Sequence, residues 1–307
     1  MAEFWTHDGF SWKKVQQPSG YLNGQWRDAK KAWVWDGASF SWVQVWTSEV
    51  EIPLFAGTGP VNLKSIFDGS QFAGTQPGRI VFRVVDNATI GTSDKFFGAI
   101  YVPDAWSWNP EIELRIGSGA NVVGVGGDGG EGRLPESAFE NLSDYDGKDG
   151  GSALLVRYPV RIENQGRIGG GGGGGGGAGG VVVDGTSFYG GGGAGGAGKA
   201  NSSGGVAVSQ IGTDFSGTGG STFGPGDRGV GEFVTNFANE NIAFGGRGGF
   251  AGSLGANGSD GDTGQDIGGF NVETFVGGFG GSVGPAIDGI SNVTYISRGV
   301  IKGPEVN

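Results

Sequence analysis

Carboxylates are the residues of this chain best able to do acid–base chemistry, because histidine and cysteine are almost absent. The sequence contains one histidine, His7, and no cysteine. Serine–histidine and cysteine–histidine nucleophiles are therefore nearly excluded, and so are metal sites built on histidine. Disulfides cannot contribute to stability, and cysteine usage gives no information on the redox compartment.

Glu111 and Glu113 form the most suggestive carboxylate pair. They occupy alternate positions of an expected strand, so their side chains point to the same face of a sheet. Glycoside hydrolysis uses such a pair. Solvent-facing acids on an ordinary sheet give the same pattern, and we favour that interpretation. We therefore expect no catalytic residues and no enzymatic activity.

Two acidic runs resemble oxygen-ligand calcium loops in their spacing. They contain Asp144, Asp146 and Asp149 in the first run, and Asp260, Asp262 and Asp266 in the second. Neither run has the distal glutamate that completes a calcium loop, and Asn271 stands where the second run would need it. Polar turns are the favoured interpretation, so no metal and no cofactor is expected.

Composition excludes several classes of partner. The chain of 307 residues suits two or three domains, and its formal net charge of −11 argues against binding to nucleic acid or to an anionic membrane. No apolar run approaches the roughly 20 residues of a membrane-spanning helix. The first residues lack the basic and apolar regions of a secretory signal. We expect synthesis in a cytoplasm without membrane insertion.

Nine consecutive glycines, Gly169–Gly177, open a glycine-rich segment that extends to Gly284. Glycine loses more backbone freedom on folding than any other residue, so an ordered run needs an unusually dense set of hydrogen bonds. A flexible linker is the alternative, but linkers bury nothing, and about ten aromatic residues separate these tracts. Collagen fits poorly, because Pro225 and Pro285 are the only prolines from residue 169 to 285.

A bundle of left-handed extended helices with three residues per turn remains. Such polyproline or polyglycine II helices can pack closely and pair backbone with backbone, which satisfies their buried N–H and C=O groups. At about 3.1 Å per residue, the first tract would span about 28 Å. We therefore predict that residues 169–307 form a C-terminal polyglycine sandwich.

The N-terminal segment, residues 1–47, carries three hairpin signals. Asp8-Gly9, Asn23-Gly24 and Asp36-Gly37 each precede a tryptophan and an alternating run, which predicts a meander of hairpins with two-residue turns. The tryptophans can close a small sheet, stack on sugars or dock onto another protein. We favour a structural role compatible with attachment, for Trp5, Trp12, Trp26, Trp33, Trp35, Trp42 and Trp46.

The middle segment, residues 48–168, is expected to be an all-β domain. Strand-like runs cover residues 79–85, 97–102, 111–116, 121–125 and 153–162, and only residues 135–142 suggest a helix. Residues 86–91, 163–169 and 295–303 end in the same way, with a turn, a β-branched residue and a glycine. This repetition indicates either stacked rungs or a sheet that passes its register to the glycine helices.

Two stretches carry a resemblance to a known class of proteins. Residues 160–168 leading into polyglycine, and residues 286–304, resemble glycine-rich tail-fibre and tail-tip proteins of tailed bacteriophages. The tryptophan hairpins are similar to those at the start of such proteins. The resemblance to T-even-type fibre-tip adhesins implies a virion protein, as a homotrimer or a monomeric cap. It also implies an N-terminal module that attaches to other tail or fibre proteins, and loops that meet a receptor on the host surface.

Recognition is expected from the loops, because polyglycine offers almost no side chains. If the tracts run up and down, loops 181–189 and 221–244 lie far from the middle domain, while loops 199–216 and 250–275 lie near it. The far loops supply aromatic and amide side chains suited to a polysaccharide or an outer-membrane protein. These receptor-binding candidates are Phe188, Tyr189, Phe223, Phe233, Asn236, Phe237, Asn239, Asn241 and Phe244. Alternatively, the phenylalanines fold under and seal the bundle.

Two functions stay open at this point. One is a receptor-binding adhesin at a phage tail tip, and the other is a structural tail or fibre component whose loops touch other virion proteins. An enzyme that degrades surface polysaccharide is less favoured, since it needs a groove with perturbed carboxylates.

Overall fold

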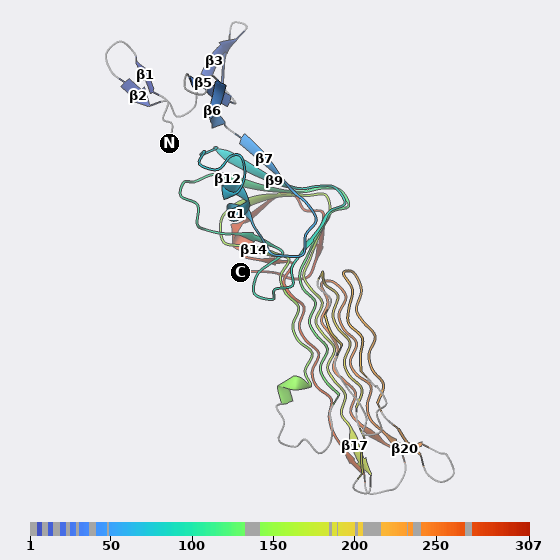
Figure 1. The fold of residues 1–307 in the computed structure, drawn as a ribbon. Helices are drawn as coiled ribbons and strands as arrows, with labels where there is room; N and C mark the ends of the chain where they lie inside the picture. Colours follow the sequence, from blue (N-terminus) through green and yellow to red (C-terminus); the bar gives the residue numbers. More distant parts are fainter. Residues whose placement is uncertain are drawn as a thin grey trace.

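The computed structural model is dominated by short β-strands and long extended segments (Figure 1). It describes residues 5–7, 12–14, 19–22, 25–28, 31–36, 41–47, 49–132, 142–183, 186–188, 190–199, 202–204, 216–231, 233–235, 241–267 and 272–307. Side chains are described from residue 49 onward, except at residues 142, 186, 233–235, 241–243 and 272. Within these residues, no helix has the length and apolar character needed to cross a membrane.

Three parallel sheets take one strand in turn from each circuit of the chain, which makes a three-faced β-helix. Sheet 1 contains β7 (Glu49–Leu54), β9 (Arg79–Val84), β12 (Glu111–Ile116), β15 (Val160–Asn164) and β24 (Val293–Ser297). Sheet 2 contains β10 (Thr89–Gly91), β13 (Asn121–Val123), β16 (Arg167–Gly169) and β25 (Val300–Lys302). Sheet 3 contains β8 (Val61–Asn62), β11 (Ile100–Val102), β14 (Leu154–Val156), β23 (Ile287–Asp288) and β26 (Glu305–Val306). Stacked rungs, one of the two predicted arrangements, are therefore present.

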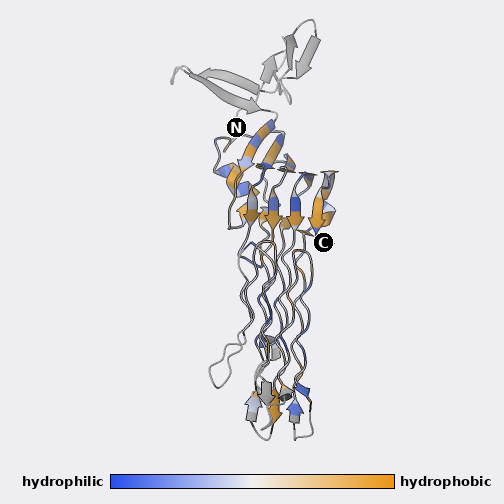
Figure 2. Cartoon of the chain, turned by 90° about the vertical axis from the view of Figure 1, so that its right-hand side faces the viewer, coloured by the Kyte–Doolittle hydropathy of each residue, from blue (hydrophilic) through white to orange (hydrophobic). Residues whose placement is uncertain are grey.

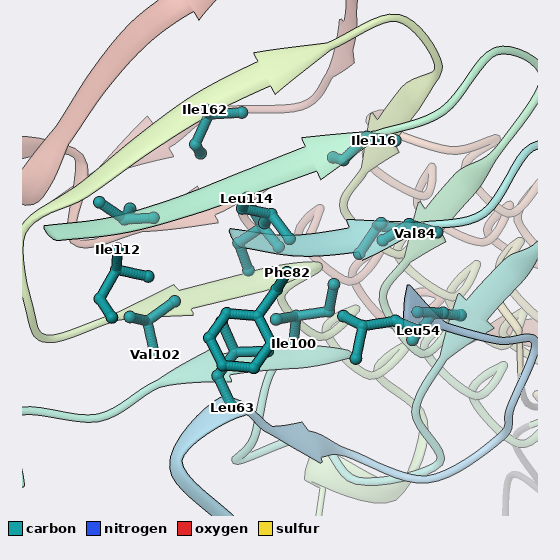
Figure 3. Packing of buried hydrophobic residues seen from close by; sticks show 14 of the residues in the cluster. Leu54, Leu63, Phe82, Val84, Ile100, Val102, Ile112, Leu114, Ile116 and Ile162 are labelled. Atoms are coloured by element: carbon teal, nitrogen blue, oxygen red, sulfur yellow. The ribbon is translucent and has the colours of Figure 1, made fainter. Parts of the chain in front are cut away.

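Alternating side chains fill the interior of the β-helix. In β7, Val50, Ile52 and Leu54 are buried while the residues between them are exposed. The same period of two recurs in β9 and β12, so stacked strands place Phe82 and Leu114 in one core (Figure 3). Figure 2 shows hydrophobic residues gathered in the strands of this unit.

The corners between sheets 1 and 2 explain the recurring sequence endings. Asn87 and Gly119 occupy this corner in successive rungs with φ of 61° and 69°, a region that asparagine and glycine adopt more readily than other residues. In the fourth rung, the buried Asn164 side chain donates to the carbonyl of Arg298 at 2.7 Å and accepts from the N–H of Gly166 at 2.9 Å. A buried amide thus joins one rung to the next.

One short helix, α1 (Leu63–Asp68), was not expected from the sequence. Asn62 caps its first turn, because the Asn62 side chain accepts hydrogen bonds from the N–H groups of Lys64 and Ser65 at 3.0 and 3.2 Å. The helix buries Leu63 and Phe67 against the β-helix core. The expected helix at residues 135–142 lies almost wholly outside the described residues.

The N-terminal segment forms three separate two-stranded antiparallel sheets within the described residues. They pair β1 (Trp5–His7) with β2 (Trp12–Lys14), β3 (Ser19–Leu22) with β4 (Gln25–Asp28), and β5 (Lys31–Asp36) with β6 (Ser41–Thr47). The three hairpins follow the predicted turn signals, and among the described residues no strand pairing joins one hairpin to another. Two residues separate the paired ends only in the second hairpin, and four residues do so in the first and third.

The glycine-rich tracts form a bundle inserted into the β-helix. The chain leaves sheet 2 after β13 and again after β16, and it returns to sheet 3 at β14 and at β23. We call the extended tracts between these strands the glycine bundle; they project away from the β-helix (Figure 1). The sheets do not follow the expected boundary at residue 169, because β23–β26 complete the β-helix and residues 124–131 and 145–151 belong to the bundle.

Tract 169–180 is the centre of the glycine bundle. Gly171, Gly174 and Gly177 donate to the carbonyls of Gly151, Lys148 and Tyr145 at 2.7–2.9 Å, so every third residue meets the same neighbour. The two other sets of every third residue donate to tracts 190–198 and 256–262. The carbonyls of the central tract accept from tracts 124–130, 246–255 and 275–284. Six neighbours therefore surround one tract, with a period of three residues.

Only glycine fits along most of this centre. A Cβ at any position from 170 to 177 would lie 1.6–2.1 Å from a carbonyl oxygen of a neighbouring tract. Such distances are impossible for real atoms, so a side chain would push the tracts apart. The eight glycines at positions 170–177 are therefore a packing requirement.

Outer tracts of the bundle carry their side chains on the solvent side. In tract 245–252, Arg247 and Phe250 are exposed while the glycines between them are buried. Asp146 and Asp149 accept hydrogen bonds from the N–H groups of Phe279 and Ser282 at 2.8 and 2.7 Å. Asp260 accepts from Gly280 at 2.8 Å. These carboxylates act as acceptors for outward-facing backbone N–H groups where no further tract supplies a carbonyl.

Candidate functional site

The bundle ends in two small antiparallel sheets at the end opposite to the β-helix, and we call this end the far tip (Figure 1). The first sheet contains β17 (Val181–Val183), β18 (Thr186–Phe188) and β22 (Val272–Thr274). The second contains β19 (Phe233–Thr235), β20 (Asn241–Phe244) and β21 (Gln265–Asp266). Six strands from three parts of the sequence, β17 with β18, β19 with β20, and β21 with β22, thus lie at one end of a hydrogen-bonded bundle.

The up-and-down order was predicted, but two loops were placed incorrectly. Phe223 lies at the near end, since the Arg167 guanidinium of β16 sits 5.7 Å from its ring centroid. Residues 221–225 are a near turn, and residues 226–231 run back along the bundle as a further tract. The loop 250–275 also splits: its turn at Gly255 bonds to Gly170 beside the β-helix, while β21 and β22 lie at the far tip.

The remaining receptor-binding candidates that the structure describes lie at the far tip, some with side chains and some with only their backbones described. Phe188 and Phe244 are half-buried in β18 and β20. Phe233 pairs with Phe244 across the second sheet, and Asn241 lies in β20, although only their backbones are described. Tyr189, Asn236, Phe237 and Asn239 lie outside the described residues. The seven tryptophans of the attachment group all lie in β1–β6, where side chains are likewise not described.

Exposed apolar side chains on the outer tracts were missed by the sequence analysis. Val276 and Phe279 are 64% and 71% exposed and follow each other at a spacing of three residues. Phe250 on tract 245–252 and Ile267 beside β21 are also exposed. The three-residue period of the glycines could have predicted these exposed positions. In an outer tract the glycines that repeat every three residues face the bundle, so the residues between them must face outward.

A hollow of about 260 Å³ lies beside the far tip. It is lined by Arg228, Phe244, Gly246, Arg247, Asp262 and Gln265. The Arg228 guanidinium lies 3.9 Å from the centroid of the Phe250 ring, and its Nη1 atom lies 3.9 Å from a carboxylate oxygen of Asp262. This is the place in the glycine bundle where cationic, aromatic and amide side chains converge.

The carboxylate pair considered for catalysis belongs to an ion-pair network on the outer face of sheet 1. Glu113 accepts hydrogen bonds from Arg79 and, at 2.6 Å, from Arg115. Burial alone would raise the pKa of Glu113, but the hydrogen bonds from Arg79 and Arg115 outweigh it and hold that pKa below its ordinary value. Glu111 pairs with Arg161. A carboxylate kept ionised in this way does not suit a general acid.

The two acidic runs do not gather into an ion site in the described part of the chain. No group of three or more histidine, aspartate or glutamate side chains has a metal-holding arrangement there. Asp146, Asp149 and Asp260 instead accept backbone N–H groups.

Comparison with known proteins points to one family. A family model described as "Phage tail fibre adhesin Gp38" matches residues 49–306. A search among curated proteins found no match. One solved structure, titled "Crystal structure of the gp37-gp38 adhesin tip complex of the bacteriophage S16 long tail fiber", is similar to the chain with 22% sequence identity. The match covers 87% of this chain and 85% of that one, with a TM-score of 0.48.

Proposed function

Because the chain belongs to the family of Gp38 phage tail fibre adhesins and is therefore a virion tail component, we propose that it binds a receptor on the host bacterial surface through the far tip. The observation that carries this proposal is the convergence of strands from three parts of the sequence, β17 with β18, β19 with β20, and β21 with β22, at one end of the glycine bundle. Loops held on a stiff scaffold are where binding residues usually lie.

We infer that the tracts of the bundle are polyglycine II helices. The support is the period of three residues in the hydrogen bonds of tract 169–180, which is the number of residues per turn of that helix. A scaffold joined by backbone hydrogen bonds in six directions loses little conformational freedom when a receptor binds. The receptor-facing loops are then pre-organised, which favours affinity.

We propose three working parts that differ from the sequence-based boundaries. Residues 1–47 would attach to another tail fibre protein, the β-helix would join that module to the bundle, and the bundle would present the far tip. A single chain supplies all three faces of the β-helix. This arrangement favours a monomeric cap over a homotrimer, since no face of the β-helix requires a strand from a second copy. Light scattering of the purified protein would decide between them.

A structural role without receptor contact is the second candidate. Phe96 and Phe55, at the β-helix end, are 89% and 67% exposed. Contiguous exposed apolar patches mark surfaces that meet other proteins, and each of these rings would contribute to such a patch. These residues would contact a neighbouring virion protein in either case, so the two functions differ only at the far tip.

Binding of purified protein to host cells tests the proposal. Replacing residues 236–240, which join β19 to β20, by glycine and serine should lower cell binding by about tenfold or more, the usual weight of one cluster of hot-spot residues. Phe223→Ser at the near turn is the matched control and should leave binding unchanged. Equal binding by the loop variant and the unmodified protein would support the purely structural role.

A further inference from the structure

Two arginines stand out in the glycine-rich segment. Between Arg167 and Arg298 the sequence contains ten acidic residues, one lysine, Lys199, and only two arginines, Arg228 and Arg247. Both arginines line the same hollow beside the far tip. An acidic segment that places its only two guanidinium groups together creates a local site for an anion.

Three adjacent tracts hold this hollow. Gly248 donates to the carbonyl of Gly229 at 3.0 Å, so the tract that bears Arg228 lies against the tract that bears Arg247. Asp262 donates its N–H to the carbonyl of Arg247 at 2.8 Å, which adds the third tract. The positions of these side chains are therefore set by bundle hydrogen bonds, and such pre-organisation favours a precise site.

The charges of the hollow leave an excess of positive charge. Among the described residues that line it, Asp262 is the only acidic one, and its carboxylate is 3.9 Å from Arg228, at the limit of ion-pair distance. Arg247 is exposed. The Arg228 guanidinium lies over the Phe250 ring, and this cation–π contact restrains the side chain. Planar guanidinium groups bind carboxylate and phosphate with paired hydrogen bonds.

The rest of the lining suits a sugar. Gln265 supplies an amide that can donate to and accept from hydroxyl groups, and Phe244 supplies a half-buried ring. A volume of about 260 Å³ is smaller than a typical drug-sized pocket and fits a single ring-sized group.

We propose that this hollow binds an acidic sugar residue, bearing a carboxylate or a phosphate, of a bacterial surface polysaccharide. The proposal rests on the proposed function and names the receptor chemistry for one part of the far tip. A carboxylate on a protein loop would meet the guanidinium groups equally well, but it would leave the amide and the ring of the hollow without a role.

Binding of the purified full-length protein to immobilised polymers tests the inference. Polygalacturonate and phosphomannan present carboxylate and phosphate on sugars, and neutral galactan and mannan are their matched controls. We expect binding to at least one acidic polymer roughly tenfold tighter than to its neutral counterpart, and a marked loss of that difference in about 0.5 M NaCl. Preference for polygalacturonate or for phosphomannan would identify the anionic group.

The double variant Arg228→Gln/Arg247→Gln should abolish the preference for the acidic polymer. Lys199→Gln/Lys302→Gln removes the same charge at the β-helix end and should leave it intact. Melting temperatures of both variants establish folding, and Arg247→Gln alone, at an exposed position, serves if the double variant unfolds. An acidic preference that survives the arginine changes would overturn the proposal.

Two further outcomes separate this inference from the proposed function. If the unmodified protein ignores acidic polymers while the arginine variant loses binding to host cells, the hollow meets a protein carboxylate and the saccharide assignment is wrong. If replacing residues 236–240 leaves cell binding unchanged, the receptor-binding function itself fails, whatever the polymers show.

Discussion

The β-helix and the glycine bundle, two parts of one chain, are held together by opposite kinds of packing. In the β-helix, stacked strands bury large side chains such as Phe82 and Ile112, and each strand pairs its backbone with the strands of the same sheet. In the bundle, the centre contains no side chain larger than a methyl group at residues 169–180, and backbone hydrogen bonds run in six directions. The β-helix is sensitive to removing atoms, and the bundle is sensitive to adding them.

The difference also determines where sequence can vary. A β-helix strand exposes every second side chain, and the outer face of sheet 1 uses these positions for ion pairs. The glycines at positions 170–177 leave no freedom for a side chain, while the outward positions of the outer tracts are unconstrained by packing. A rigid interior with variable ends is well suited to changing a recognition surface without changing the scaffold.

The largest expected effect comes from adding one methyl group to the bundle centre. Gly173→Ala would place a Cβ 2.0 Å from the carbonyl oxygen of Gly281, so we expect more than about 4 kcal/mol of destabilisation. Thermal unfolding of the variant measures this. Gly224→Ala is the matched control, because the nearest atom to its added Cβ is 3.5 Å away. Equal melting temperatures would refute the packing argument.

Removing atoms from the β-helix should have the next largest effect. Phe82→Ala deletes a fully buried ring between sheets and should cost about 3–5 kcal/mol. Chemical denaturation, followed by one spectroscopic probe in the β-helix and one in the glycine bundle, measures this loss of stability. Phe279→Ala on the bundle surface is the counterpart, and it should change stability little because that ring is 71% exposed. Similar losses from both changes would contradict the contrast between the units.

Replacing a carboxylate that accepts a backbone N–H should cost less. Asp149→Ala leaves the N–H of Ser282 without its acceptor, with an expected loss of about 1 kcal/mol. Asp149→Asn keeps an acceptor oxygen and should recover most of the stability. Amide hydrogen exchange at Ser282 would report the change directly. If asparagine behaves like alanine, charge is the property that matters, and the hydrogen bond is not.

The smallest effect should be a dependence on pH carried by Glu113. Hydrogen bonds from Arg79 and Arg115 lower its pKa in the folded state, against the opposing effect of burial. As pH falls below the ordinary value of 4.5, the unfolded chain therefore binds a proton before the folded chain does. The contribution of Glu113 is complete above that pH and declines below it. Glu113→Gln should flatten the melting temperature between about pH 5 and pH 3; an unchanged slope would assign the acid sensitivity to other carboxylates.

Sequence could predict what depends on local spacing. The repeated endings at 86–91, 163–169 and 295–303 indicated rungs because each corner needs the same turn and glycine. The run 153–162 was expected as one strand, but β14 and β15 are separate strands on different sheets. Helix α1 was missed, since six residues stabilised by a cap and by tertiary contacts carry too little periodicity.

The misplacement of Phe223 has a physical explanation. Residues 202–204, 226–231 and 256–264 belong to extended tracts, but the sequence analysis included them in loops because half or fewer of their residues are glycine. One glycine in three is sufficient at the bundle surface, where the other positions face solvent, as Asp260 and Asp262 do. When these extra tracts are counted, Phe223 falls at the end of the bundle beside the β-helix and not at the far tip. The convergence of Arg228, Arg247 and Gln265 depends on the same register between tracts, which no local pattern contains.

Because the hydrogen bonds of the glycine bundle repeat every three residues, the length of the bundle can take only certain values. Inserting a single residue into tract 169–180 would turn the following chain by a third of a revolution and aim every later N–H at the wrong neighbour. Length can change only by whole turns of about 9 Å, added to all neighbouring tracts together. Longer or shorter relatives built on this plan should therefore differ by multiples of three residues in each tract.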